Sequence, residues 1–505
     1  MMPEKPTDTQ YPSGARRMMI LITTLMVAVM AAIDLTIVTV ALPHIQGALD
    51  ATPTSITWIV TMYTIGQAIS IGVMGHLSKL MGRKMLVLVS IVSFVSFSCL
   101  CGLSTSLDEM VILRFLQGIA GGPLIPLSQS VIIDSYPPES RAKAISLWIM
   151  GVLAGPAIGP MIGGYLTQHL SWQWIFFINL PVGILGFFLS MAYISRVAPV
   201  KVRTDWIGFV FLLVAICSFQ ILLDQGNILD WWNSKSIVWL TISSIVFGFL
   251  FVGWSITCSN PLMELSLFKN MNFVIGCLMI CLMGMMFLSI LVAFPILLED
   301  IYRWEIDFAG MVIGTFGIAG IFGAFVTGRV IAKAGARLMS FLGFTVSGIG
   351  LFWCSRLNLD ASPIEVIAPI SVTGVGLLIT FVSSVTIAMS SIGPEHRDQG
   401  TGMFNFIKTL GFSFGVTYVS TMIYRKKQSN FSIYGSDLKP WSDGVLDWSE
   451  RLGNMPTDSA QFAAILYAEL SRQTAMVSIS QTLVVTSVLA FCCIVTLPLV
   501  RMKKS

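Results

Sequence analysis

A repeated stretch decides the architecture of this chain. Residues 138–141 read Pro-Glu-Ser-Arg and precede Gly155 and Gly159; residues 394–397 read Pro-Glu-His-Arg and precede Gly411 and Gly415, each 256 positions later. Glycines seven residues apart, set among basic residues, occur at 75 and 82 and again at 328 and 335, an offset of 253. Two anchor pairs at nearly one offset indicate that the chain contains two copies of one unit.

The composition around these repeats places the chain in lipid. Of 505 residues, 55% are apolar and only 11% charged, whereas a soluble domain has about 25% charged residues. A net charge of +4 is too small for a nucleic-acid surface. The nine cysteines lie in or beside apolar runs without metal-ligand spacing, so we interpret them as small core residues and expect neither disulfides nor a metal. Collagenous, disordered and disulfide-rich secreted classes are excluded.

Long apolar runs predict an all-α polytopic membrane protein with fourteen spans, because a helix crosses the hydrocarbon core with about 20 apolar residues. The runs lie near 18–42, 56–78, 84–104, 109–133, 141–166, 174–195, 205–225, 235–256, 271–298, 306–332, 338–357, 363–391, 400–424 and 477–500.

The basic residues predict the orientation of these spans. With the N-terminus inside, 19 of the 30 Lys and Arg residues fall in cytoplasmic segments, nine in external segments and two within spans. Six of the nine external ones lie in one long loop, 425–476. Without that loop, 19 Lys and Arg residues are cytoplasmic and 3 are external. The positive-inside rule therefore predicts that both termini are cytoplasmic.

Repeats and spans together predict three segments. Residues 1–195 form an N-terminal six-helix bundle, 196–270 hold two inserted helices and a linker, and 271–505 form a C-terminal six-helix bundle with the external loop 425–476. Duplicated halves are typical of transporters, which bind substrate between them near the bilayer midplane. For the loop we considered a cap on the outer mouth and, alternatively, a docking segment for another protein.

Asp34 is the strongest single candidate for a functional residue, because it lies in the middle of the first span. An ionised carboxylate there costs about 2.5–3.5 kcal/mol on insertion scales, so such residues are usually functional. We interpret Asp34 as a proton carrier. The alternatives are a carboxylate paired for structure, or one that reaches a water-filled vestibule.

Five stretches, in order along the chain, resemble one family. They run from Asp34 (Asp-Leu-Thr-Ile-Val-Thr-Val-Ala-Leu-Pro), from Arg114 to Gly122, from Gly151 to Gly164, from Trp174 to Gly183, and from Arg397 to Gly411. They look like the motifs of the fourteen-span drug:proton antiporters of the major facilitator superfamily (EmrB/QacA type). The resemblance implies that superfamily's fold and proton-coupled efflux of drugs. Lys79 departs from it, because the family carries Asp there, which puts a charge-relay latch built on that Asp in doubt.

The fourth-span motif brings a second charge, Arg114, which is always protonated. It could set the charge state of Asp34 by approaching and withdrawing; the alternative is a structural clamp on backbone carbonyls or on Gln117.

The fifth-span motif repeats glycine every four residues, which places the glycines on one helix face where another helix can approach closely. Plain helix packing explains that face; the resemblance adds that it seals the contact between the halves against proton leak. We expect Pro156 and Pro160 to kink this span. The motif residues are Gly151, Gly155, Pro156, Gly159, Pro160, Gly163 and Gly164.

Two further groups complete the candidates. The short basic loops are interpreted as gating loops, although positive-inside anchoring alone explains their charge; they contain Gly75, Gly82, Arg83, Lys84, Gly328, Gly335 and Arg337. Thr36, Gln117, Asn405 and Lys408 are candidates for lining the cavity. Lys408 would favour anions there, or else reaches the interface as a simple anchor.

We therefore expect a proton-driven antiporter that exports hydrophobic small molecules across the cytoplasmic (inner) membrane by alternating access. No phosphate-binding loop or catalytic triad is present in the sequence, so neither an ATPase nor another enzyme is expected, and no cofactor. The expected partners are the substrate, protons, the bilayer and, in a Gram-negative host, a periplasmic adaptor protein, but no nucleic acid. The alternatives are an importer or uniporter of a small organic solute on the same fold, and a non-transporting membrane sensor.

Overall fold

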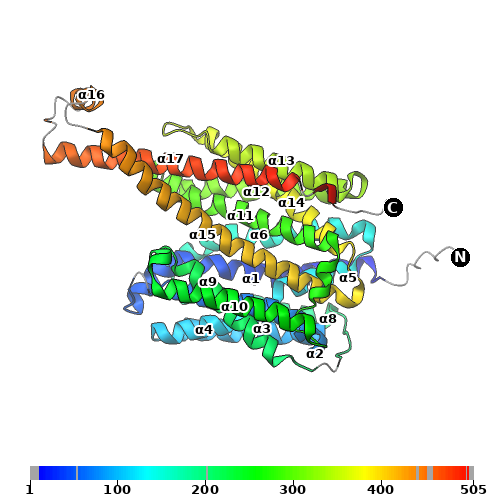
Figure 1. The fold of residues 1–505 in the computed structure, drawn as a ribbon. Helices are drawn as coiled ribbons and strands as arrows, with labels where there is room; N and C mark the ends of the chain where they lie inside the picture. Colours follow the sequence, from blue (N-terminus) through cyan, green and yellow to red (C-terminus); the bar gives the residue numbers. More distant parts are fainter. Residues whose placement is uncertain are drawn as a thin grey trace.

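The computed structural model describes residues 11–52, 55–200, 203–438, 443–451, 456, 459–495 and 497–499, and its regular secondary structure there is helical. Apolar runs become helices because only an intrasegment hydrogen-bond ladder satisfies every backbone group in lipid. Figure 1 shows the long helices running in roughly one direction, with α1 beginning and α17 ending on the same side of the molecule. We call that side the termini end.

The first helices correspond to the expected spans one to six. They are α1 (Gly14–Ala48), α2 (Trp58–Met81), α3 (Arg83–Leu103), α4 (Leu107–Gly121), α5 (Leu124–Ser135), α6 (Pro138–His169), α7 (Trp174–Phe177) and α8 (Asn179–Tyr193). The fourth span, expected as one helix, is divided into α4 and α5 at Gly122 and Pro123, because proline lacks the N–H that would continue the ladder.

The remaining helices follow in the same order as the expected spans. They are α9 (Trp206–Gln225), α10 (Lys235–Thr257), α11 (Met271–Pro295), α12 (Ile306–Ala334), α13 (Ala336–Cys354), α14 (Pro363–Met389), α15 (Arg397–Asp437), α16 (Asp443–Arg451) and α17 (Ala460–Ile494), with a π-helical turn at Ile296–Ile301 after α11. Within the described residues, 13 helical segments are long and apolar enough to cross a membrane. The fourteenth segment is the 32-residue helix α6, which corresponds to the span expected near 141–166.

Most of the described part of segment 425–476, expected as a long loop, is helical. Helix α15 continues to Asp437 and α17 already begins at Ala460. These extensions pack on each other: Phe431 and Tyr467 form an edge-to-face pair with centroids 5.1 Å apart, and Asn430 Nδ2 donates to Ser478 Oγ at 3.2 Å. Polar residues end an apolar run but not a helix, so hydropathy located the end of the apolar run and not the end of the helix.

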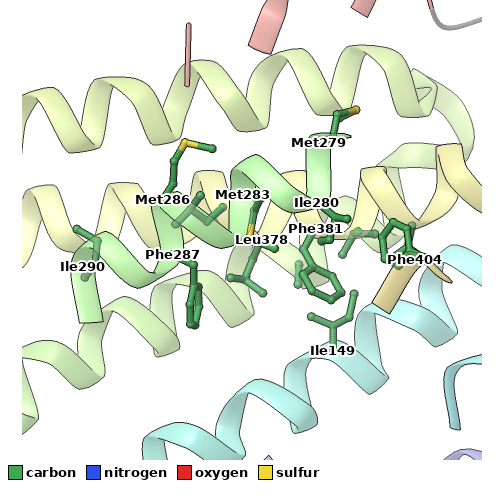
Figure 2. Packing of buried hydrophobic residues seen from close by; sticks show 14 of the residues in the cluster. Ile149, Met279, Ile280, Met283, Met286, Phe287, Ile290, Leu378, Phe381 and Phe404 are labelled. Carbon is green, nitrogen blue, oxygen red and sulfur yellow. The ribbon is translucent and has the colours of Figure 1, made fainter. Parts of the chain in front are cut away.

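The helices form two groups that meet along a few contacts. In Figure 1, α11 to α14 and α17 lie above, and α1 to α5 with α8 to α10 lie below, while α6 and α15 lie between them. Helix α6 packs on the lower group through α1, and α15 packs on the upper group through α11. The two groups then meet mainly where α2 contacts α15 and where α6 contacts α12. The largest buried apolar cluster takes most of its residues from α11 to α17 and continues into α1, α2, α5, α6, α9 and α10, so it joins the two groups. Figure 2 shows Met279, Met283, Phe287 and Ile290 of α11 within it.

Candidate functional site

A buried polar cluster surrounds Asp34 in the middle of α1. Asp34 is 0% exposed and Arg114 of α4 is 1% exposed. Arg114 Nη1 donates to Asp34 Oδ2 at 2.8 Å, and Gln117 Nε2 donates to Asp34 Oδ1 at 2.9 Å. Because Arg114 and Gln117 are three residues apart on α4, both reach α1 from one face.

Arg114 is fixed by more than the carboxylate. Its Nη1 also donates to Gln117 Oε1 at 2.8 Å, its Nε lies 3.4 Å from the carbonyl oxygen of Ile59, and its guanidinium lies 4.0 Å from the ring centre of Tyr63. The structure thus includes both contacts considered from the sequence: the pair with Asp34 and the clamp on Gln117 and a backbone carbonyl.

Asn179, like Tyr63 and Ser98, belongs to this cluster although no role was predicted for it from the sequence. Its Nδ2 donates to Asp34 Oδ1 at 3.1 Å and lies 3.0 Å from Ser98 Oγ, which itself donates to the Phe176 carbonyl at 2.9 Å. Asn179 begins α8 after the short helix α7. The available signal was an asparagine inside an otherwise apolar run, which in lipid needs a partner.

Asp34 and Arg114 are electrostatically coupled. Asp34 receives three hydrogen bonds, one of them from the Arg114 guanidinium. A proton arriving on Asp34 removes the counter-charge of Arg114, and breaking a buried pair from one side costs about 3–5 kcal/mol. Protonation therefore favours an arrangement in which Arg114 has other partners or water.

The glycine face of α6 packs against α1, the helix that carries Asp34. A Cβ on Gly151 would lie 2.3 Å from Leu25, on Gly155 3.0 Å from Ala32, on Gly159 2.2 Å from Thr36 Oγ1, and on Gly163 2.8 Å from the Ile37 carbonyl. Gly164 has only Val40 near, at 3.8 Å. Four of the five glycines therefore permit a close helix–helix approach.

This face was expected at the contact between the two halves, and there the structure differs. Its glycines contact α1, whereas the contact of α6 with α12 uses other residues: a Cβ on Gly328 would lie 2.3 Å from Ser146 Oγ and 3.3 Å from the Cα of Lys143. The helix is assigned without interruption through Pro156 and Pro160, whose side chains lie outside the described part of the chain.

The basic loops are shorter than expected. Gly82 alone separates α2 from α3 (φ 80°, ψ 141°), and Gly335 alone separates α12 from α13 (φ 82°, ψ 146°). Both need the positive φ that glycine adopts without strain, so the two copies share a backbone conformation. Gly75 and Gly328 lie inside helices; at Gly75 a Cβ would lie 2.4 Å from Gln399 of α15. Lys84 donates to the Met191 carbonyl, and Arg337 is exposed.

A charge network joins the two groups of helices at the termini end. Arg83 lies 2.6 Å from Asp134, at the end of α5, and 2.7 Å from Asp398 in the first turn of α15. Ser78 and Ser130 donate to Asp398, and Arg397 pairs with Asp134. Acidic residues near a helix N-terminus interact favourably with its dipole.

Lys79 also forms an ion pair here, with a positive charge where the family resemblance implies an Asp. Its Nζ lies 3.8 Å from Glu264, which also contacts His396 Nδ1 at 2.7 Å. Ion pairs therefore form at this place although the expected Asp is absent: the carboxylates come from Glu264 and Asp398, and Lys79 in the last turn of α2 supplies a positive charge.

The remaining cavity candidates lie around α15. Asn405 is 1% exposed, and its Nδ2 donates to Gln129 Oε1 of α5 at 2.6 Å. Lys408 Nζ donates to Asn405 Oδ1 at 2.8 Å. Thr36 and Gln117 do not join this group: Thr36 faces Gly159, and Gln117 belongs to the Asp34 cluster. The nine cysteines are free, and within the described ranges no cluster of His, Cys, Asp and Glu could hold a metal ion.

Comparison with known proteins agrees with this geometry. The family model described as Major Facilitator Superfamily matches residues 24–416. The multidrug export protein EmrB of Escherichia coli (strain K12) is 31% identical over 484 residues, 95% of this chain and 94% of that protein. The fatty acid resistance protein FarB of Neisseria gonorrhoeae is 31% identical over 477 residues, 94% of each chain.

Solved structures share the fold at low identity. The proton:xylose symporter XylE aligns with a TM-score of 0.60 and 12% identity, covering 95% of this chain and 96% of its own. The human organic anion transporter MFSD10 aligns with a TM-score of 0.58 and 12% identity, covering 94% and 99%. The all-helical transporter fold expected from the sequence is confirmed.

This chain belongs to the major facilitator superfamily and is related to the EmrB-type multidrug exporters. It is a multi-pass membrane transporter, and its family consists of transporters and not enzymes.

Proposed function

We propose that this transporter is a proton-driven antiporter that exports hydrophobic small molecules across the cytoplasmic membrane, with both termini in the cytoplasm. The observation that carries the proposal is the Asp34–Arg114 pair, 2.8 Å apart and closed to solvent in the middle of spanning helices. Intramembrane charges of this kind mark ion pathways in transporters. The relatives named for multidrug export support the cargo class.

Alternating access would use the contacts already described. In the proposed cycle, α2 and α6 rock against α15 and α12, and the charge network around Arg83 and Asp398 breaks when the termini end opens. Asp34 takes a proton from outside as substrate leaves, and releases it inside when Arg114 pairs with it again. The membrane potential adds about 2.3 kcal/mol per charge per 100 mV.

The experiment is transport in proteoliposomes under an imposed pH gradient, with a panel of apolar fluorescent compounds. Wild type is expected to move at least one compound against its gradient, and Asp34→Asn to lose that movement while it still exchanges substrate down a gradient. Asp224→Asn, which removes a half-buried carboxylate of α9 outside the cluster, is the matched control and keeps coupled transport.

The outcomes separate the alternatives. Full gradient-driven transport by Asp34→Asn contradicts the proton role. Downhill movement that ignores the pH gradient in wild type favours a uniporter, movement in the same direction as protons favours an importer, and no movement of any compound favours a sensor.

We also propose that, in a cell with two membranes, the extensions of α15 and α17 with α16 contact a periplasmic adaptor protein. Exposed apolar and aromatic side chains on these helices support this, among them Ile433, Tyr434, Leu446 and Tyr467. Cross-linking from residue 433 in intact cells is the test, and a pattern identical to that of a lipid-facing site such as Phe249 contradicts it.

A further inference from the structure

A shallow groove lies at the termini end, where α6 meets α12 of the upper group. It has a volume of about 200 Å³, including its open mouth, and is lined by Lys143, Ser146, Leu147, Phe325 and Arg329. The two helices touch beside it, since a Cβ on Gly328 of α12 would lie 3.3 Å from the Cα of Lys143. Both halves of the transporter therefore contribute to this groove.

Each helix brings one cation to the groove, at the same depth. Lys143 is the sixth residue of α6, and Arg329 is the sixth residue from the end of α12, so each lies about 8 Å of helix from a helix end. Both side chains are exposed, and among the residues that the structure describes neither forms an ion pair with a carboxylate. Like charges that border one groove repel each other, so an anion placed between them is favourable.

The surroundings of Arg329 are apolar and exposed. Its guanidinium lies 3.5 Å from the ring centre of Phe325, one helical turn away. Phe325, Val326 and Val330 are each 38–39% exposed. Exposed apolar side chains next to a basic residue near the end of a spanning helix are typical of the level where lipid headgroups meet acyl chains. The stacked guanidinium is therefore positioned to contact a headgroup.

The chemistry of the groove suits a phosphodiester that carries acyl chains. Arginine binds two phosphate oxygens at once, and lysine adds a point charge. Leu147 and Phe325 offer apolar surface beside the two cations. The positive-inside rule explains why basic residues lie at this end, but not why one from each half borders the same groove. Basic pockets between spanning helices on the cytoplasmic side bind anionic lipid headgroups.

We propose that this groove binds an anionic phospholipid, whose phosphate bridges Lys143 of α6 and Arg329 of α12 and stabilises the arrangement in which the termini end is closed. A zwitterionic lipid is disfavoured because its own cation cancels the charge of its phosphate, and free phosphate gains nothing from the apolar lining. The site itself does not depend on antiport. Its effect on conformation rests on the proposed alternating access, in which α6 and α12 separate when the termini end opens.

The test measures lipid binding to the purified full-length protein in detergent by native mass spectrometry. The probes are dioleoyl phosphatidylglycerol, dioleoyl phosphatidylcholine and inorganic phosphate. We expect phosphatidylglycerol to bind at least about fivefold more tightly than phosphatidylcholine, and inorganic phosphate not to displace it. Lys143→Gln and Arg329→Gln should each weaken phosphatidylglycerol binding about fivefold, and Arg329→Lys, which keeps the charge, should retain most of it.

Two further variants make the result selective. The double variant Lys143→Gln/Arg329→Gln should bind phosphatidylglycerol no better than phosphatidylcholine. Arg196→Gln is the matched control, because Arg196 is an exposed arginine that follows α8 at the same end and does not line the groove. Equal binding of the two lipids in wild type, an equal loss in Arg196→Gln, or displacement of the lipid by inorganic phosphate overturns the proposal.

A distance measurement tests the bridge. Met85 and Leu338 are exposed in the first turns of α3 and α13, one in each group of helices. Spin labels attached there through a non-natural amino acid leave the nine native cysteines in place. Nanodiscs that contain phosphatidylglycerol should shift the distance distribution toward shorter distances than nanodiscs of phosphatidylcholine alone, and the double variant should not respond. Selective binding without any shift in wild type overturns the bridge.

Transport in proteoliposomes separates this inference from the proposed function. If phosphatidylglycerol binds with the expected preference but no compound follows the pH gradient, the lipid site stands and antiport fails. If a compound follows the pH gradient while the two lipids bind equally, the lipid site is wrong and antiport stands.

Discussion

Arg114 and Lys408 both place a positive charge deep among the spanning helices, in opposite surroundings. Arg114 lies against a carboxylate at 2.8 Å, a glutamine, a backbone carbonyl and the face of Tyr63. Lys408 has a single amide oxygen and two distant rings. Burial alone therefore does not define the role of a charge, because the surroundings decide how much stability is lost when the charge is removed.

The largest expected effect comes from removing the paired cation. Arg114→Met leaves Asp34 buried without its counter-charge, so we expect a loss of about 3–5 kcal/mol of stability. The measurement is thermal unfolding of the purified protein in detergent. Adding Asp34→Asn to Arg114→Met should recover most of the stability but no gradient-driven transport. If Arg114→Met alone is as stable as wild type, Arg114 and Lys408 do not differ in their contribution to stability.

The next effect concerns the packing that excludes water from the pair. Gly159→Ala places a Cβ 2.2 Å from Thr36 Oγ1 and 3.2 Å from the Ile33 carbonyl, so α6 must move away from α1. Overpacking of this kind costs about 1–3 kcal/mol, and we expect a proton leak measured with a pH dye in proteoliposomes. Thr36→Ala should rescue it in part. Gly164→Ala, which meets only Val40, is the control; an equal leak there would show that the glycine face has no special role.

A smaller effect is expected at Asn179. Asn179→Ala removes one of the two amide donors to Asp34 Oδ1. Losing this hydrogen bond should slow gradient-driven transport by up to about tenfold, as one hydrogen bond of about 1–1.5 kcal/mol allows; the measurement is the initial rate in proteoliposomes. Ser98→Ala, which loses a contact to Asn179 but none to Asp34, should slow it less. A rate equal to that of wild type in Asn179→Ala would contradict a role for this contact.

The smallest effect is expected from removing the unpaired cation. Lys408→Met leaves no carboxylate behind, so thermal unfolding should stay within about 0.5 kcal/mol of wild type or improve slightly. Asn405 Nδ2 keeps its contacts with Gln129 and the Thr401 carbonyl. If Lys408→Met is destabilised as much as Arg114→Met, Lys408 stabilises the fold, and the two charges do not differ in this respect.

What the sequence predicted well depends on rare residues in a uniform background. Asp34 and Arg114 were found because a charge in an apolar run has few explanations, and the structure places them in contact. Gly82 and Gly335 were found because a repeat at nearly constant offset does not arise from composition, and they share one backbone conformation.

What it missed depends on contacts between distant segments. Asn179 is 145 residues from Asp34, and no local pattern pairs them. The glycine face of α6 could be recognised, but not the helix it meets. The ion pairs of Lys79 and Arg83 use Glu264 and Asp398, which lie far away in the sequence, so no local pattern predicts them. The continuation of α15 and α17 into 425–476 was not predicted, because polarity was taken as the end of a spanning helix.

The length of α15 has a mechanical consequence. Its 41 residues span about 60 Å, from Asp398 in the charge network, past Lys408, to the extension that packs on α17. One continuous helix thus links the charge network, Lys408 and the far surface of the molecule. A tilt of ten degrees about the level of Lys408 would displace the far tip of the helix by about 8 Å, so a spin label or antibody fragment on the extension would report whether the termini end is open.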